Sequence, residues 1–250
     1  MSAVSRHEIR RGADRARTTT DWLDSAHSFS FGSYYDPDNL GLGALQAFNE
    51  DLLRPGPGYP VHAHADIEIL TWVLAGSLTH RDGDGEATVI AAGQLHQLSA
   101  GTGIRHTEAS SSPDQAVHLV QMWLATDQPG LPPSRRLVPV ELPPGRLVTV
   151  AAGTAGPDDP AVVRIRQRAA ALSVARLPAG ASVTLPAGPL GHLFVAAGSV
   201  EVRAATGEPV GVLAAGDALR TTGGGERLTA AEPAELLVWQ LRATTPAPPR

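Results

Sequence analysis

The sequence predicts an all-β protein that contains two copies of one antiparallel barrel or sandwich, and three observations support this fold class. Short stretches rich in β-branched and aromatic residues are separated by turns about every 8 to 12 residues. Landmarks of the first half recur in the second half at a nearly constant offset. A proline-rich segment lies between the two halves. The chain of 250 residues is long enough to bury a core in each half.

The first half predicts a series of short strands. Residues 1–20 are polar and rich in arginine, so we expect an arm or an edge strand there. Residues 28–50 predict a strand, a turn at Asp36-Pro37-Asp38-Asn39 and a second strand. Further strands are expected at residues 67–74, 77–81, 87–91, 95–99 and 117–124. Glycine turns separate them, at Gly56-Pro57-Gly58, Gly76, Asp82-Gly83-Asp84-Gly85, Gly93 and Gly101-Thr102-Gly103.

The second half repeats the first. Ala75-Gly76-Ser77-Leu78 recurs 122 residues later as Ala197-Gly198-Ser199-Val200, and Gly58 and Gly180 share the same offset. Ala91-Ala92-Gly93 recurs as Ala214-Ala215-Gly216, with one residue of slack. Landmarks in one register predict two copies of one fold.

Between the copies, residues 127–145 are rich in proline, which cannot donate a hydrogen bond within a central strand. We therefore predict an N-terminal domain of residues 1–128, a linker of residues 129–145 and a C-terminal domain of residues 146–250.

Two pairs of candidate metal ligands lie in the first copy, His62-Ala63-His64 and His106-Thr107-Glu108. Alternate side chains of a strand point to the same face, so both members of each pair can aim into one cavity. Three imidazoles and one carboxylate suit a divalent transition metal such as Fe(II), with Mn, Co, Ni, Cu or Zn as alternatives. The same positions in the second copy read Thr184, Pro186, Leu228 and Ala230, so we expect a single metal site.

Composition excludes several classes of protein. The net charge of -5 and the pI near 6.0 provide no basic surface for nucleic acid. The chain has no cysteine, which excludes disulfides, thiolate metal sites and cysteine nucleophiles. No stretch approaches the roughly 18 apolar residues of a membrane helix, and we see no signal peptide. We therefore expect a soluble, cytoplasmic protein that contacts neither nucleic acid nor membrane directly.

These motifs resemble the cupins, and within the cupins the pirin family. Gly56, His62, His64, Glu68 and Gly76 follow the first cupin motif, with one extra residue before the last glycine. The segment GQLHQLSAGTGIRHTE is similar to the pirin signature, with its Ala-Gly-x-Gly-Ile turn and its final His-x-Glu. Further similarities are RRGADRA, Ser28-Phe29-Ser30-Phe31, Tyr34-Tyr35-Asp36-Pro37, Asn49-Glu50-Asp51, Pro133-Ser134 and AELLVWQL.

The resemblance implies a bicupin, with two tandem double-stranded β-helix (jelly-roll) barrels and metal in the N-terminal barrel only. It places the metal on His62, His64, His106 and Glu108. Some pirins cleave quercetin with dioxygen, and others are iron-dependent partners of transcription regulators or metabolic enzymes. The sequence departs from the family pattern at Ala63, Ala65 and Gln94, where proline, a basic residue and aspartate are usual.

From these observations we expect a monomeric, mononuclear metal-dependent dioxygenase that cleaves quercetin-like flavonols with O2. Glu108, as ligand and base, and Glu68, from beyond the ligands, are the candidate catalytic carboxylates, because both share the even-numbered parity of the His62–His64 pair. The alternatives are a non-catalytic, iron-binding regulator that docks on another protein, and a different cupin chemistry such as isomerisation or hydrolysis on Zn or Mn. We expect no organic cofactor, because no strand-turn-helix follows Gly101-Thr102-Gly103.

The other histidines are expected to have ordinary roles. We predict that His80 is a solvated strand end and that His118 is a hydrogen-bonded core residue. His192 is expected to be structural, and His96 is a candidate for the cavity mouth.

Overall fold

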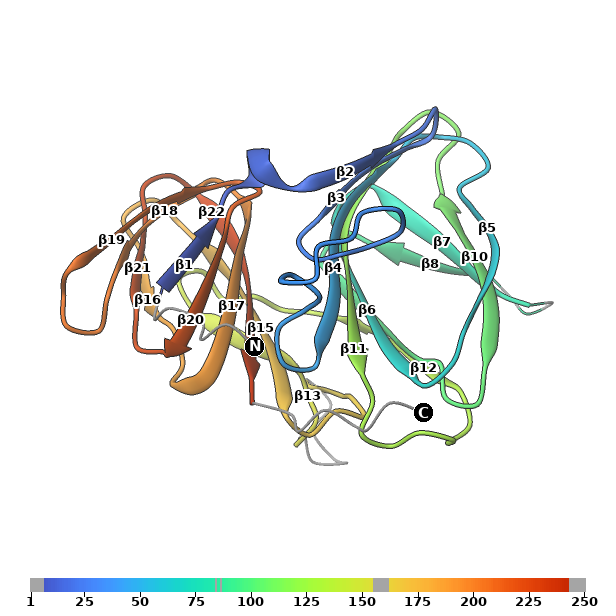
Figure 1. Cartoon of the computed structure of the whole chain (residues 1–250). Helices are drawn as coiled ribbons and strands as arrows, with labels where there is room; N and C mark the ends of the chain where they lie inside the picture. The colour runs from blue at the N-terminus through green and yellow to red at the C-terminus, as the bar shows by residue number, and fades with distance from the viewer. Residues whose placement is uncertain (1–6, 84, 86, 155–161, 243–250) are drawn as a thin grey trace.

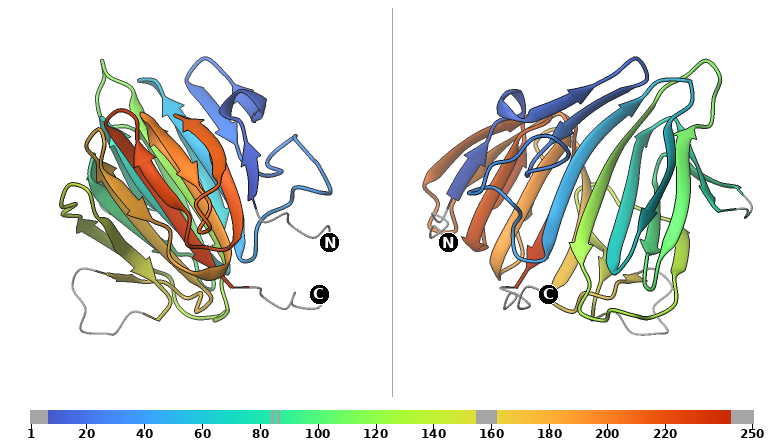
Figure 2. Two further views of the ribbon diagram at one scale, coloured as in Figure 1. Left: turned by 90° about the vertical axis from the view of Figure 1, so that its left-hand side faces the viewer. Right: turned by 45° about the vertical axis from the view of Figure 1, so that its right-hand side comes forward.

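The protein consists of two β-barrels that lie side by side (Figures 1 and 2). The computed structural model describes residues 7–83, 85, 87–154 and 162–242. Apart from one short 3-10 helix, η1 (Gly12–Asp14), the elements of these residues are strands, which confirms the all-β fold class. None of the described residues forms a helix that is long and apolar enough to cross a membrane.

The first barrel contains a seven-stranded and a four-stranded sheet. The large sheet has the order β12 (Ser134–Pro139), β9 (Gln94–Ser99), β6 (Ile67–Ala75), β11 (Val117–Ala125), β4 (Leu45–Leu53), β3 (Leu23–His27) and β2 (Ala16–Thr19). The small sheet has the order β5 (Tyr59–His64), β10 (Ile104–Ser110), β7 (Ser77–Asp82) and β8 (Ala87–Ala91). The expected hairpin joins β7 to β8, although Asp84 lies outside the described residues.

The second barrel repeats this arrangement. Its large sheet has the order β1 (His7–Arg10), β20 (Ala218–Gly223), β17 (Gly188–Ala197), β22 (Ala234–Leu241), β15 (Ala170–Leu177), β13 (Leu147–Ala152) and β14 (Val163–Arg164). Its small sheet has the order β16 (Ser182–Thr184), β21 (Arg227–Ala230), β18 (Ser199–Arg203) and β19 (Pro209–Ala214). The series β20-β17-β22-β15 corresponds to β9-β6-β11-β4, so the predicted internal repeat is confirmed.

Two edge strands differ from the expected domain layout. The segment 129–145, which its prolines predicted to be a linker, contains β12, and β12 pairs with β9 of the first barrel. Proline is tolerated here because β12 is an edge strand and Pro139 is its last residue. Strand β1, from the expected N-terminal arm, pairs with β20 of the second barrel. Each barrel is therefore completed by a strand from outside its repeat unit; residues 1–6 of the arm lie outside the described part of the chain.

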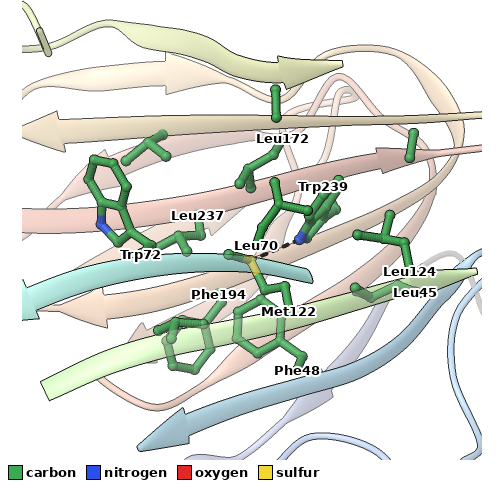
Figure 3. Close-up of a cluster of buried hydrophobic side chains, with 14 of the residues drawn as sticks. Leu45, Phe48, Leu70, Trp72, Met122, Leu124, Leu172, Phe194, Leu237 and Trp239 are labelled. Atoms are coloured by element: carbon green, nitrogen blue, oxygen red, sulfur yellow. Dashed lines mark hydrogen bonds between the residues drawn. The ribbon is translucent and has the colours of Figure 1, made fainter. Parts of the chain in front are cut away.

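The large sheets of the two barrels share one hydrophobic core (Figure 3). Phe48, Trp72 and Met122 of the first barrel belong to the same buried cluster as Phe194 and Trp239 of the second. Two indole groups add polar contacts within this core: Trp239 Nε1 donates to the Met122 sulfur at 3.2 Å, and Trp72 Nε1 donates to Glu235 Oε1 at 2.7 Å. The two barrels therefore pack through a continuous apolar interface.

The interiors of the two barrels differ in chemistry. The second barrel is filled by an apolar cluster that includes Leu193, Val202 and Leu228. The corresponding space of the first barrel contains buried polar side chains, among them His80, His106 and Glu108. Within the described part of the chain, the first barrel thus gathers several histidines and a carboxylate in the space that an apolar cluster fills in the second.

Candidate metal centre

Three histidines converge between the neighbouring strands β5 and β10. His62 lies opposite His106 in the register of these strands, and His64 lies opposite Ile104. The Nε2 atoms of His62 and His106 are 2.7 Å apart. Candidate ligand atoms of His62, His64 and His106 all lie within 4.8 Å of one another. The alternation of β5 and the antiparallel pairing with β10 therefore bring three imidazoles to one point.

The surroundings of the three imidazoles suit a metal ion. His62 Nδ1 donates to the carbonyl oxygen of Pro60 at 2.8 Å, which leaves the Nε2 lone pair directed at the cluster. His64 Nε2 is buried and has no hydrogen-bond partner among the described residues. Burial lowers the pKa of His64 and of His106 to about 4, so both rings are neutral at pH 7. The neutral His64 and His106 rings, together with the unpartnered Nε2 atom of His64, fit a divalent cation.

Glu108 lies beside this group and is not one of its three members. The register between β10 and β5 shifts between His106 and Glu108, so Glu108 faces Tyr59. Its carboxylate is buried and accepts hydrogen bonds from Gln121 Nε2 at 2.9 Å and from His80 Nδ1 at 3.2 Å. Burial opposes its ionisation, but the His80 hydrogen bond and the nearby histidine charges outweigh burial and lower the pKa of Glu108 to about 2.

His80 is the important residue that sequence reasoning missed. The expected solvated strand end is wrong, because the side chain of His80 is only 1% exposed. Its Nδ1 atom faces Glu108 and its Nε2 atom lies 2.7 Å from Asp82 Oδ1. Burial opposes protonation of His80, but the hydrogen bonds and charges of Glu108 and Asp82 raise its pKa. The shared parity of Leu78, His80 and Asp82 was a signal that His80 faces inward.

His80 and Asp82 also lie close to His106, with candidate ligand atoms within 4.8 Å of one another. Both ring nitrogens of His80 already contact carboxylates, however, and Asp82 also forms an ion pair with Arg135. We therefore describe this group as an ion-paired chain beside the three histidines.

Glu68 does not point toward the histidines, contrary to its expected position near the metal. It lies on β6 with Leu70 and Trp72, whose side chains belong to the core between the barrels. Its carboxylate accepts hydrogen bonds from Gln97 Nε2 and from the Arg166 backbone N–H, each at 3.2 Å. The parity argument fails because strand alternation stops between His64 and Ile67, where Asp66 has a positive φ of 49°.

The remaining histidines lie outside the three-imidazole cluster. His96 is buried, its ring centroid is 4.7 Å from that of His80, and burial lowers its pKa to about 4. His118 Nε2 lies 3.0 Å from Glu50 Oε1, so the predicted hydrogen bond is present, but the side chain is 34% exposed and does not belong to the core. His192 is fully buried and packs against Phe29 and Phe48 near the interface of the barrels.

A cavity of about 670 Å³ opens to solvent at the rim of the first barrel beside His64. Its wall includes the small residues Ala63 and Ala65, the apolar Ile104, and the charged Asp82 and Arg105. The volume falls within the range of small-molecule sites, roughly 300 to 1,000 Å³. One member of the histidine cluster is therefore accessible from a cavity that can hold a small molecule.

Two tandem jelly-roll barrels, one with an apolar interior and one with a histidine cluster, define a bicupin. The chain belongs to the pirin family. The family described as Pirin matches residues 10–124. A "Putative quercetin 2,3-dioxygenase" of Mycobacterium tuberculosis is 47% identical over 239 residues, which cover 94% of this chain and 95% of the relative.

A curated sequence and a solved structure, both from Escherichia coli, extend the comparison. A quercetin 2,3-dioxygenase is 42% identical over 125 residues, which cover 50% of this chain and 54% of the relative. The crystal structure of the bacterial pirin YhhW in complex with nickel(II) superimposes with a TM-score of 0.85 at 28% identity, covering 95% of this chain and all of that one. Together with the three converging histidines, membership of the family indicates a metal site in the first barrel.

Proposed function

We propose that the protein is a mononuclear metal-dependent dioxygenase that cleaves quercetin-like flavonols with O2. One observation carries the proposal: His64, a neutral member of the three-histidine cluster, lines an open cavity large enough for a small aromatic molecule. The names of the relatives from M. tuberculosis and E. coli point to the same reaction.

We assign the metal to His62, His64, His106 and Glu108, with Fe(II) as the ion and Mn, Co, Ni, Cu or Zn as alternatives. When bound, Fe(II) would supply the redox chemistry that couples an electron-rich flavonol to O2 and would acidify the 3-hydroxyl group of the substrate. Three histidines and one carboxylate leave coordination positions for exogenous ligands, as this chemistry requires.

Glu108 is the proposed base for the 3-hydroxyl proton. Because the pKa of Glu108 is low, its carboxylate is a weak base toward a free phenol. Proton transfer to Glu108 would therefore require the bound metal to acidify the 3-hydroxyl group. The proton would be accepted at Oε2, since the neutral Gln121 donor is displaced from this oxygen more easily than the charged His80 donor from Oε1. Glu68 has no part in this step, because it faces the core between the barrels.

The cavity wall supports an aromatic, acidic substrate. Ala63 and Ala65 leave space where larger side chains are usual in the family. Arg105 lies opposite Ala63 in the register of β10 and β5, lines the same cavity and is exposed. Its guanidinium can pair with phenolate oxygens, so Arg105 supplies the basic group that is missing at Ala65.

The alternative, a non-catalytic iron-binding regulator, predicts a closed cavity with a charged outer face. An enzyme predicts an open, apolar mouth between the barrels. The cavity is open, and alanine and isoleucine form part of its wall, which favours the enzyme, although the cavity lies in the first barrel and not between the two. All of its lining residues belong to the first barrel, so the substrate would not contact the second.

The decisive test is aerobic incubation of the iron-loaded protein with quercetin. We expect consumption of O2 and release of carbon monoxide, measured with an oxygen electrode and by gas analysis. If neither gas changes with any of the candidate metals, the regulator hypothesis replaces the enzyme hypothesis.

The matched control is the double variant His62→Ala/His106→Ala, which should lose both stoichiometric metal and quercetin cleavage. His118→Ala should keep one ion, because His118 contacts Glu50 outside the cluster. Retention of one ion by the double variant would show that the ligand set is wrong.

A further inference from the structure

We propose that His80 is a positioning residue that, together with Asp82, holds the Glu108 carboxylate in the orientation required for metal binding. This inference rests on the proposed role of Glu108 as a ligand. It concerns a residue outside the ligand set, and it is based on a chain of hydrogen bonds that runs from Glu108 to the surface of the barrel.

The first link of the chain is between neighbouring strands of the small sheet. His80 on β7 lies directly opposite Glu108 on β10. His80 Nδ1 is 3.2 Å from Glu108 Oε1, and both side chains are almost completely buried. Because the Glu108 carboxylate is buried, its rotamer depends on the groups around it. The contact with His80 therefore selects the orientation of the carboxylate.

The second link fixes His80 itself. Its Nε2 atom is 2.7 Å from Asp82 Oδ1, and Asp82 lies opposite His106 in the register of β7 and β10. Ionised carboxylates only accept hydrogen bonds, so His80 donates from both ring nitrogens. A ring that donates at both ends cannot flip or rotate without breaking one of these charge-assisted bonds.

The third link reaches the edge strand β12. Arg135 on β12 forms an ion pair with Asp82 through the second carboxylate oxygen. Strand β12 comes from the segment between the barrels and pairs with β9 on the other sheet of the first barrel. The Glu108 orientation is therefore tied to the two sheets of this barrel at once.

Glu108 keeps its capacity to bind a metal in this arrangement. Oε1 accepts from His80 and Oε2 accepts from Gln121, one donor for each oxygen. A carboxylate has about four lone-pair sites, so each oxygen retains one for a cation. Partners of this kind, which contact a ligand and not the metal, typically change metal affinity by about 10–100-fold when they are removed.

If His80 only stabilised the fold, its variants would not differ in metal affinity according to which hydrogen bond they keep. His80→Asn and His80→Gln therefore distinguish a positioning role from a purely structural one. In His80→Asn the amide nitrogen takes the place of Nδ1 and keeps the donor to Glu108. In His80→Gln the amide nitrogen takes the place of Nε2 and keeps only the Asp82 contact. His80→Leu removes both donors. His96→Gln is the matched control, because His96 is also buried in this barrel and its ring packs against His80.

The experiment measures Co(II) affinity by chelator competition and the visible spectrum of bound Co(II), with thermal unfolding of the metal-free protein as the check on folding. We expect His80→Leu and His80→Gln to weaken Co(II) binding by about 10–100-fold and to alter its spectrum. His80→Asn should lose less affinity than His80→Gln, and His96→Gln should retain wild-type affinity. If His80→Leu folds and binds Co(II) as tightly as the wild type, the proposal is wrong. If His80→Leu does not fold, equal losses of Co(II) affinity in His80→Asn and His80→Gln would overturn the proposal instead. Glu108→Gln tests the ligand set separately from the positioning role. Unchanged Co(II) affinity in Glu108→Gln refutes the proposed ligand set. Weaker Co(II) binding in Glu108→Gln without weaker binding in His80→Leu refutes only the positioning role of His80.

Discussion

At the scale of single residues, Asp51 on β4 is a buried carboxyl group of the first barrel outside the proposed ligand set. It accepts hydrogen bonds from the Ser25 hydroxyl and, at 3.1 Å, from the Tyr59 hydroxyl. Burial is the main cause that raises the pKa of Asp51 to about 6, from an ordinary value of 3.8. The folded protein therefore binds this proton more tightly than the unfolded chain does.

This pKa predicts a specific dependence of stability on pH. Below about pH 4 Asp51 is protonated in both states, and its full contribution to stability is present. As the pH rises through about 6 the contribution is lost, because only the unfolded chain ionises freely; a shift of this size corresponds to about 3 kcal/mol. Urea unfolding of the metal-free wild type and of Asp51→Asn should show the variant gaining stability relative to the wild type between pH 4 and pH 7. If the free energies of unfolding of the wild type and of Asp51→Asn changed equally with pH, the prediction would be contradicted.

The sequence predicted which histidines gather, but not all of their neighbours. His62 and His64 are one residue apart on a strand, and His106 lies on a second strand of the same motif, so local alternation was sufficient. His80 was missed because its contact with Glu108 depends on the pairing of β7 with β10, which spacing alone does not reveal. Glu68 was misplaced because one left-handed residue, Asp66, interrupts the alternation.

At the scale of elements, the repeat offset correctly predicted two copies of one fold, whereas the two edge strands β12 and β1 were not predicted to complete the barrels. Strands β6 and β17 occupy equivalent positions because both copies contain the same glycine turns. Strand β12 escaped prediction because proline forbids a central strand and still permits an edge strand. The partner of β1 is at the other end of the chain, so no local pattern could identify it.

The glycine before β5 predicts a difference between the two copies. Gly58 and its counterpart Gly180 have φ angles of 65° and 77°, so alanine at either position costs about 1–2 kcal/mol in the left-handed region. A Cβ atom on Gly58 would also lie 2.1 Å from the Glu108 carbonyl oxygen, whereas one on Gly180 would meet nothing within 4 Å.

Gly58→Ala must therefore displace β5 from β10 and weaken metal binding, with a further loss of about 1–3 kcal/mol in stability. Gly180→Ala is the control and should bind metal normally. Urea unfolding and Co(II) titration of both variants test this difference, and equal behaviour of the two would contradict it.

At the scale of the whole molecule, Glu68 joins the two barrels. Its carboxylate accepts the Arg166 backbone N–H from the second barrel and the Gln97 amide from the first, and it is buried. A buried acceptor of this kind stabilises the interface, since its removal leaves buried donors unsatisfied.

Glu68→Ala is therefore expected to lower the free energy of unfolding by about 1–3 kcal/mol and to leave metal stoichiometry unchanged. The control is Glu232→Ala, at an exposed position where we expect a change within about 0.5 kcal/mol. Chemical unfolding and metal analysis are the measurements. A variant of normal stability that had lost quercetin cleavage would instead restore Glu68 as a catalytic residue.

The pairing of β1 with β20 has a consequence for the order in which the protein is completed during synthesis. His7 and Glu226 are hydrogen-bonded to each other and are 219 positions apart in the chain. The strands of the first barrel, β2 to β12, all lie between Ala16 and Pro139, so that barrel has its complete set before the second is made. His7–Arg10 leaves the ribosome earlier than all of them, yet it cannot join its sheet until Ala218–Gly223 has followed. One of the first strands to be synthesised is therefore among the last to reach its partner.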